Sequence, residues 1–326
     1  MDRNEVMRFI IDILKGCVMG IANVIPGVSG GTMAVAMGIY DKLIGAITHL
    51  FKDFKKSFMT VLPIGIGMII GIVGLSMVID WMFGTIPIQT NLLFIGLILG
   101  GVPSIIGRVK GHKTGAGSIV GFIIFFAIVV GLSFLQQRTE SEKAMLEMSE
   151  ESVSTEENQE YVPDIELSAG KIVVLAAVGV IASATMVVPG VSGSMMLMLL
   201  GYYTIIIGCI SGAVHALSAG QTAAILKDIG VLVPFGIGVV VGIIVIAKII
   251  EFLLEKHEGI TFWCILGLII GSPIAIIIVN IDIFREINVI SVLTGILTFV
   301  VGFVIAFFLG KDPEKAPEEK TETENK

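Results

Sequence analysis

The sequence predicts an all-α polytopic membrane protein with two inverted-topology repeats, each a re-entrant helical hairpin plus three transmembrane helices. Composition is the first reason: 55% of the 326 residues are hydrophobic, only 15% are charged, and the mean hydropathy is +0.95. Several apolar runs reach the roughly 20 residues that a helix needs to cross a bilayer. A soluble globular domain is excluded, because soluble domains of this length are not so apolar.

A duplicated motif is the second reason. Residues 24–32 read VIPGVSGGT and residues 187–194 read VVPGVSGS; aligned on Pro26 and Pro189, 9 of the 17 positions from Val24 to Tyr40 are identical. Proline and glycine interrupt helices, and an interrupted helix at membrane depth persists only where protein or a wet cavity surrounds it. Interrupted segments at corresponding positions of two halves indicate a transporter's binding site.

The chain divides into two membrane repeats, 1–138 and 169–310. The first has a hairpin at about 8–50, with a second arm from Met33 to Leu50, and spans at about 60–83, 91–107 and 117–136. The second has a hairpin at about 171–210, with a second arm from Met195 to Ile210, and spans at about 230–254, 260–280 and 290–309. Residues 139–168, with ten acids and one base, predict a solvated, disordered linker, and 311–326 form a charged tail.

The distribution of positive charge is the third reason. Three spans are an odd number, so the second half enters the membrane from the opposite face, which makes the repeats inverted. One side then collects ten basic residues and the other five: Arg3, Arg8, Lys52, Lys55, Lys56, Arg108, Lys110, Lys113, Lys256 and Lys311 against Arg138, Lys143, Lys171, Lys227 and Arg285. The richer side is expected to be cytoplasmic, which places both termini inside and the acidic linker outside.

The two motifs form the tips of the hairpins, where we expect an anion site. The helical arms that begin at Thr32 and Met195 present N–H groups without intrahelical partners and with positive dipole character. Such ends bind anions, glycine allows close approach to the backbone, and Ser29, Ser192 and Ser194 add hydroxyl donors. A phosphate, sulfate or carboxylate fits these donors. The alternative is close packing of helices through small residues.

Ionisable residues at membrane depth are the accessory candidates. Asp80 and Glu251 occupy equivalent positions of the two repeats, and they are either interfacial or a proton- or cation-linked carboxylate pair. Lys15 either neutralises a phosphate at the first tip or pairs with Asp12 one helical turn away.

Tyr40 and Tyr203 are also equivalent, and either close the cavity or lie at the membrane interface. The sequence contains no HExxH, Walker loop or nucleophile elbow. An enzyme, a metal site, a cofactor and a nucleic-acid partner are therefore not expected, whereas a homo-oligomer remains open.

The residues from Asn23 to Thr32, with Gly38-Ile39-Tyr40 behind them, resemble the polyprenyl-phosphate transporter family, the undecaprenyl-phosphate translocases formerly described as a domain of unknown function. The resemblance covers about residues 5–310. Asn23 departs from it, since aspartate is expected in many members, and this weakens any role for a carboxylate at that position.

The resemblance implies a prokaryotic cytoplasmic-membrane transporter that returns undecaprenyl phosphate from the outer to the inner leaflet by alternating access, with the long chain in the membrane lipids. It implies a phosphate site made of Pro26, Gly27, Ser29, Gly30, Gly31, Thr32, Pro189, Gly190, Ser192, Gly193 and Ser194. The alternative is a secondary transporter of a small soluble anion that uses the same tips.

Overall fold

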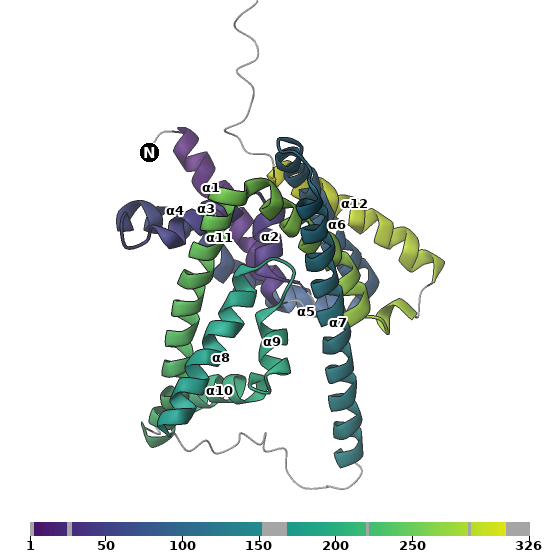
Figure 1. Cartoon of the computed structure of the whole chain (residues 1–326). Coiled ribbons are helices and arrows are strands. Elements are labelled where there is room, and N and C mark those ends of the chain that lie inside the picture. Colours follow the sequence, from purple (N-terminus) through teal and green to yellow (C-terminus); the bar gives the residue numbers. More distant parts are fainter. Residues whose placement is uncertain (1–2, 25–27, 152–167, 220–221, 286–287, 311–326) are drawn as a thin grey trace, which may run out of the picture.

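The computed structural model describes residues 3–24, 28–151, 168–219, 222–285 and 288–310, and nearly all of them are helical (Figure 1). The elements are α1 (Arg3–Val24), α2 (Gly30–Ala36), α3 (Tyr40–Thr48), α4 (Phe54–Ile69), the π-helical turn η1 (Ile70–Gly74), α5 (Leu75–Thr85), α6 (Pro87–Lys110), α7 (Ala116–Glu151), α8 (Ala169–Val187), α9 (Gly193–Leu199), α10 (Tyr203–Ala219), α11 (Thr222–Val279), the 3-10 turn η2 (Ile283–Arg285) and α12 (Val289–Leu309).

Six helices in the described part are long and apolar enough to cross a membrane, or seven if the bent pair α9 and α10 is one span. This confirms an all-α, multi-pass membrane protein. The three predicted spans of the first half correspond to α4 with η1 and α5, to α6 and to α7, and those of the second half to two parts of α11 and to α12. The helix α8, predicted as a hairpin arm, is also long enough to span the membrane.

The helix α11 contains two of the predicted spans, which a break at His257 separates. The Thr261 hydroxyl donates to the carbonyls of both His257 and Leu253, at 2.9 and 3.0 Å. Eight residues of straight helix would separate Leu253 from Thr261 by about 12 Å. The chain therefore turns sharply at His257, and α11 consists of two consecutive helices.

The second arm of each hairpin is not one helix, contrary to the prediction. Gly38 and Gly201 adopt positive φ angles of 68° and 75°, which end α2 and α9 and let a new helix start in another direction. The helices α9 and α10 are bent by 113° to each other. Each hairpin thus consists of a long helix, a seven-residue helix and a third helix.

The acidic segment also differs from its prediction, because α7 continues through Glu151. A disordered conformation from residue 139 onward is therefore wrong as far as Glu151. This stretch is rich in Glu, Lys, Ala, Met and Leu and has no Gly or Pro, so its intrinsic helix propensity is high.

The duplication extends to backbone geometry at the tips. Both α2 and α9 have seven residues and follow an extended serine, Ser29 or Ser192, 163 positions apart. Both helices end with equivalent capping bonds. The N–H group of Gly38 at the end of α2, and that of Gly201 at the end of α9, donates to the carbonyl three residues before it. The two motifs are therefore equivalent structures and not only similar sequences.

In each half, glycines bring the first helix into close contact with the first spanning helix, and the contacting positions of the two halves correspond. A Cβ added at any of these glycines would meet a backbone carbonyl of the partner helix. In the first half the pairs are Gly16 with Ile64, Gly67 with Ile13 and Gly71 with Cys17; in the second they are Gly179 with Phe235, Gly238 with Ala176 and Gly242 with Val180. Close backbone approach through small residues is typical of membrane helices.

The third spanning helix of each half packs on the second spanning helix of the other half. In the first interface, Gly96 and Gly100 of α6 face the carbonyls of Phe299 and Phe303 of α12. In the second, Gly267 and Gly271 of α11 face the carbonyls of Phe122 and Phe126 of α7. Glycines and the carbonyls of phenylalanines thus form the contact in both interfaces.

These contacts give a matched prediction. Gly67→Ala and Gly238→Ala should each lower the stability of the folded protein by about 1–3 kcal/mol, because the helices must separate. Gly65→Ala and Gly236→Ala lie two residues earlier in the same helices. They add a methyl group in open space and should be neutral or slightly stabilising. The midpoint of thermal unfolding in detergent measures the difference; equal behaviour of the two pairs would contradict the packing.

The core lies around α2, all of whose residues are buried. The largest buried side chains there, Met33 and Met37, belong to a cluster shared with α1, α3, α6 and α11. In Figure 1, α1 to α3 occupy the upper part of the view and α8 to α10 the lower part. The two hairpins thus reach toward each other.

Candidate functional site

The two hairpin tips touch. The backbone N–H of Gly190 donates to the hydroxyl of Thr32 at 2.7 Å, although 158 positions separate the two residues. A Cβ added at Gly31 would lie 3.0 Å from the carbonyl oxygen of Val187. The Tyr40 hydroxyl donates to the same carbonyl at 3.2 Å. The two sequence-predicted tips therefore lie in direct contact.

The first tip is closed and internally bonded. The hydroxyl of Ser29 accepts the N–H of Gly31 at 3.2 Å and so caps α2, while the Asn23 side-chain oxygen accepts the N–H of Gly30 at 3.2 Å. Ser29 is 4% exposed and Thr32 is fully buried. Asn23 thus acts as a neutral acceptor for a tip amide, a role that a carboxylate would also fill.

The second tip is more open. Ser194 is exposed and Ser192 is half-buried, and their hydroxyls share a hydrogen bond of 2.7 Å. Unlike Ser29, Ser192 makes no side-chain cap bond to its helix. Gly190 has φ of 86°, and a Cβ there would lie 2.9 Å from Val129, so glycine is required for both reasons.

The remaining predicted tip residues divide into two groups. Pro189 and Gly193 are buried at the second tip, and a Cβ on Gly193 would meet the Met186 side chain. Pro26 and Gly27 lie outside the described residues. The proline-glycine break that is repeated in the two halves was thus sufficient to locate the contact between the two tips.

The accessory candidates lie in different places. Tyr40 is buried with 6% exposure in the contact between the tips, whereas Tyr203 is half-buried at the start of α10. Lys15 is buried on α1 with 3% exposure, and Asp12 forms an ion pair with Lys42 of α3.

Glu251 is held by the first hairpin. The Thr48 hydroxyl donates to its carboxylate at 2.8 Å, and Nδ1 of His49 lies 3.3 Å from the same oxygen. Asp80 falls in α5, but its side chain lies outside the described part of the chain. A joint role of the two carboxylates therefore stays a prediction.

Sequence reasoning missed the polar role of α3. Besides Lys42 and the Glu251 contacts, Asp41 forms an ion pair with Arg108 of α6, and the Arg108 guanidinium lies 5.3 Å from the ring centre of Phe262. The helix α3 is thereby tied to α1, α6 and α11. The sequence feature that could have indicated this role is the adjacent acid and base directly after Tyr40. The second motif has Thr204 and Ile205 at the equivalent positions.

Comparison with known proteins identifies the family. The family model described as undecaprenyl phosphate translocase-like matches residues 19–284. A "Polyprenyl-phosphate transporter" of Staphylococcus aureus (strain NCTC 8325 / PS 47) is 30% identical over 267 residues, which cover 82% of this chain and 85% of the relative. A protein of the same name from Vibrio cholerae serotype O1 is 26% identical over 284 residues, covering 82% of this chain and 77% of the relative. No solved structure matches the chain.

The match begins within α1 and ends within η2, and it therefore includes both tips. It confirms the resemblance that the tip residues carry, and it confirms a transporter rather than an enzyme. With its multiple membrane-spanning helices and its two joined tips, the chain belongs to the undecaprenyl phosphate translocase-like family.

Proposed function

We propose that the protein carries undecaprenyl phosphate from the outer to the inner leaflet by alternating access, with the phosphate bound between the two tips. The observation that carries this proposal is the hydrogen bond from Gly190 to Thr32, which joins equivalent elements of the two halves. A site shared by two repeats is where a transporter holds its substrate while the halves move around it. The names of the relatives supply the class of lipid.

The donors at the tips suit a phosphate monoester. The hydroxyl of Thr32 now accepts a hydrogen bond from Gly190, and the hydroxyls of Ser192 and Ser194 bond to each other. A phosphate oxygen can replace each acceptor: the Gly190 N–H would donate to the phosphate, and the freed hydroxyls would rotate to donate as well. Binding therefore exchanges internal hydrogen bonds for stronger ones to a charged acceptor.

The asymmetry between the tips supports two access states. The helix α2 is wholly buried, whereas α9 has only Gly193 and Met195 buried, although the two helices have the same length and equivalent C-terminal capping bonds. In a transporter of two equivalent halves, one conformation buries one tip and the other conformation buries its counterpart. The ion pairs of α3 with α1 and α6, and its contact with Glu251, would hold the present state closed on their side.

The orientation follows from the charges. With the predicted inverted arrangement, Arg108, Lys256 and both termini would lie on the cytoplasmic side, and Lys171, Lys227 and the acidic segment would lie outside. The α3 contacts with Arg108 and Glu251 then lie on the cytoplasmic side. This state would receive lipid from outside, and breaking those contacts would release the phosphate inward.

The test is the exposure of undecaprenyl phosphate on the cell surface, measured with a phosphate-directed probe in cells without this or any other translocase. Wild-type protein should clear the outer leaflet, whereas a Ser192→Ala, Ser194→Ala variant at equal expression should leave the lipid exposed. Exposure that does not change with wild-type protein would overturn the lipid substrate, and uptake of labelled phosphate or sulfate would then identify a small-anion transporter. Full clearance by the variant would exclude the serines from the site.

A further inference from the structure

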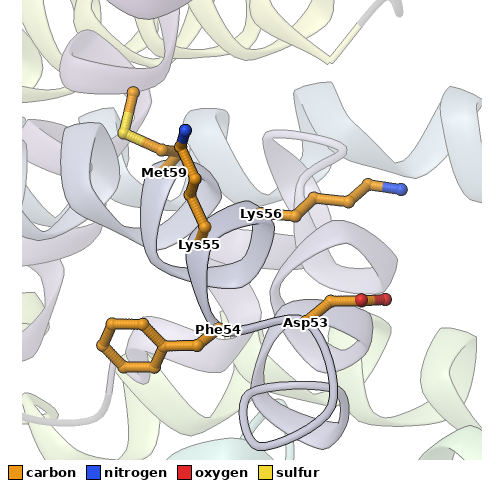
Figure 2. A pocket seen from close by; sticks show the side chains of 5 residues that line it. All are labelled: Asp53, Phe54, Lys55, Lys56 and Met59. Atoms are coloured by element: carbon orange, nitrogen blue, oxygen red, sulfur yellow. The ribbon is translucent and has the colours of Figure 1, made fainter.

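Two surface grooves occur at equivalent positions of the two halves. The first, here called the α4 groove, is lined by Asp53, Phe54, Lys55, Lys56 and Met59 and has a volume of about 560 Å³ (Figure 2). The second, the α11 groove, has about 460 Å³ and is lined by α8 and α11 residues that include Ile172, Leu226, Ile229, Val233 and Ile237.

The register of the repeats relates the grooves. The tight glycine contacts pair Gly67 with Gly238, an offset of 171 positions. The same offset pairs Lys56 with Lys227, next to Leu226 of the second groove. Both grooves therefore lie at the beginning of the first spanning helix of their half. The two linings share two equivalent positions, Lys55 with Leu226 and Met59 with Gly230, and the α11 groove also includes Ile172 of α8.

The α4 groove combines positive charge with exposed apolar surface. Lys55 and Lys56 are both exposed, while Phe54 is 63% and Met59 54% exposed. In Figure 2, Lys55 rises beside Met59, Lys56 extends to the same side as Asp53, and Phe54 points to the opposite side. Ammonium groups beside exposed aromatic and thioether side chains are typical of the zone where lipid headgroups meet acyl chains.

The α11 groove differs in its chemistry. Leu226 is 67%, Val233 51% and Ile237 58% exposed, on a helix apolar enough to span the membrane. Such residues face lipid chains. The α11 groove thus offers only apolar surface, whereas the α4 groove combines cations with apolar surface and so suits the anionic head of a lipid.

We propose that the α4 groove is a peripheral docking site for the phosphate of the transported polyprenyl phosphate, with Lys55 and Lys56 as its cationic partners. The proposal rests on the proposed function for the identity of the lipid. Charge complementarity selects a phosphate, and the exposed Phe54 and Met59 provide contact for the first prenyl units. The groove belongs to the predicted cytoplasmic side, where the lipid leaves the tips, and Asp53 opposes its retention.

The test uses the full-length protein in nanodiscs of phosphatidylcholine, with bound polyprenyl monophosphate counted by native mass spectrometry. Wild-type protein should bind one lipid at the tips and a second at the groove. The Lys55→Gln, Lys56→Gln variant should weaken the second binding by about fivefold for each lysine removed. Lys52→Gln, which removes one positive charge from the same loop outside the groove lining, should leave the second binding unchanged, and Asp53→Asn should strengthen it.

Three comparisons decide between lipid sources and between the two proposals. Polyprenol without phosphate should not occupy the groove, and binding of phosphatidylglycerol should fall by the same factor per charge removed in Lys52→Gln and in the groove variant. If phosphatidylglycerol instead loses the same binding as polyprenyl phosphate, or if Lys52→Gln has the same effect, the docking site is wrong. The Ser192→Ala, Ser194→Ala variant should lose only the first lipid; loss of cell-surface clearance with the second lipid retained separates the tips from the groove.

Discussion

Thr32→Val should reduce transport of polyprenyl phosphate at least about tenfold while the protein remains folded. Valine has nearly the same shape as threonine, so the change removes only the hydroxyl that accepts the Gly190 N–H and that we propose as a phosphate donor. A hydrogen bond from this hydroxyl to the charged phosphate contributes about 1.5–3 kcal/mol, and about 1.4 kcal/mol corresponds to a factor of ten. Initial rates in proteoliposomes with labelled lipid measure this loss.

Thr32→Ser is the matched control, because it keeps the hydroxyl and removes a methyl group. Its transport rate should stay close to that of the wild type, and its binding of polyprenyl phosphate should be retained. The hydrogen bond would be irrelevant to transport if valine and serine at this position gave the same rate. A lower midpoint of thermal unfolding for valine alone, with transport intact, would assign the bond to stability only.

Arg108→Glu should have the second large effect, on both stability and transport. It replaces the guanidinium that pairs with Asp41 and lies over Phe262 by a second carboxylate, so two like charges face each other between α3 and α6. Both side chains are about one third exposed, and water therefore screens part of the repulsion. We expect a loss of about 1–3 kcal/mol and a shift away from the state in which α3 is tied down.

The exchange variant Asp41→Arg, Arg108→Glu tests the pair itself. It restores opposite charges in reversed order and should recover a large part of the thermal midpoint and of the transport rate. The exchange leaves the net charge of the protein unchanged, so a change in net charge cannot explain a recovery. No recovery in the exchange variant would mean that Arg108 acts through Phe262 or through another partner rather than through Asp41.

The membrane spans could be predicted from sequence because hydropathy over about 20 residues is a local property. The helices α6 and α12 therefore agree closely with the predicted 91–107 and 290–309. The tips were also visible, since a proline-glycine break at membrane depth has few explanations. The change of direction at Gly38 was harder to predict. The repeated glycine was apparent in the sequence, but its positive φ angle depends on how α3 packs.

The sequence by itself determined the class of protein, the duplication and the two tips, because these depend on composition, on the period of apolar residues and on repeated motifs. The tertiary structure alone decided which groups meet: Thr32 with Gly190, Asp41 with Arg108, and Thr48 with Glu251. It also decided that α2 is sealed and α9 is not, although the motifs are alike. Contacts between residues 67 to 203 positions apart depend on the packing of whole helices, which no local pattern records.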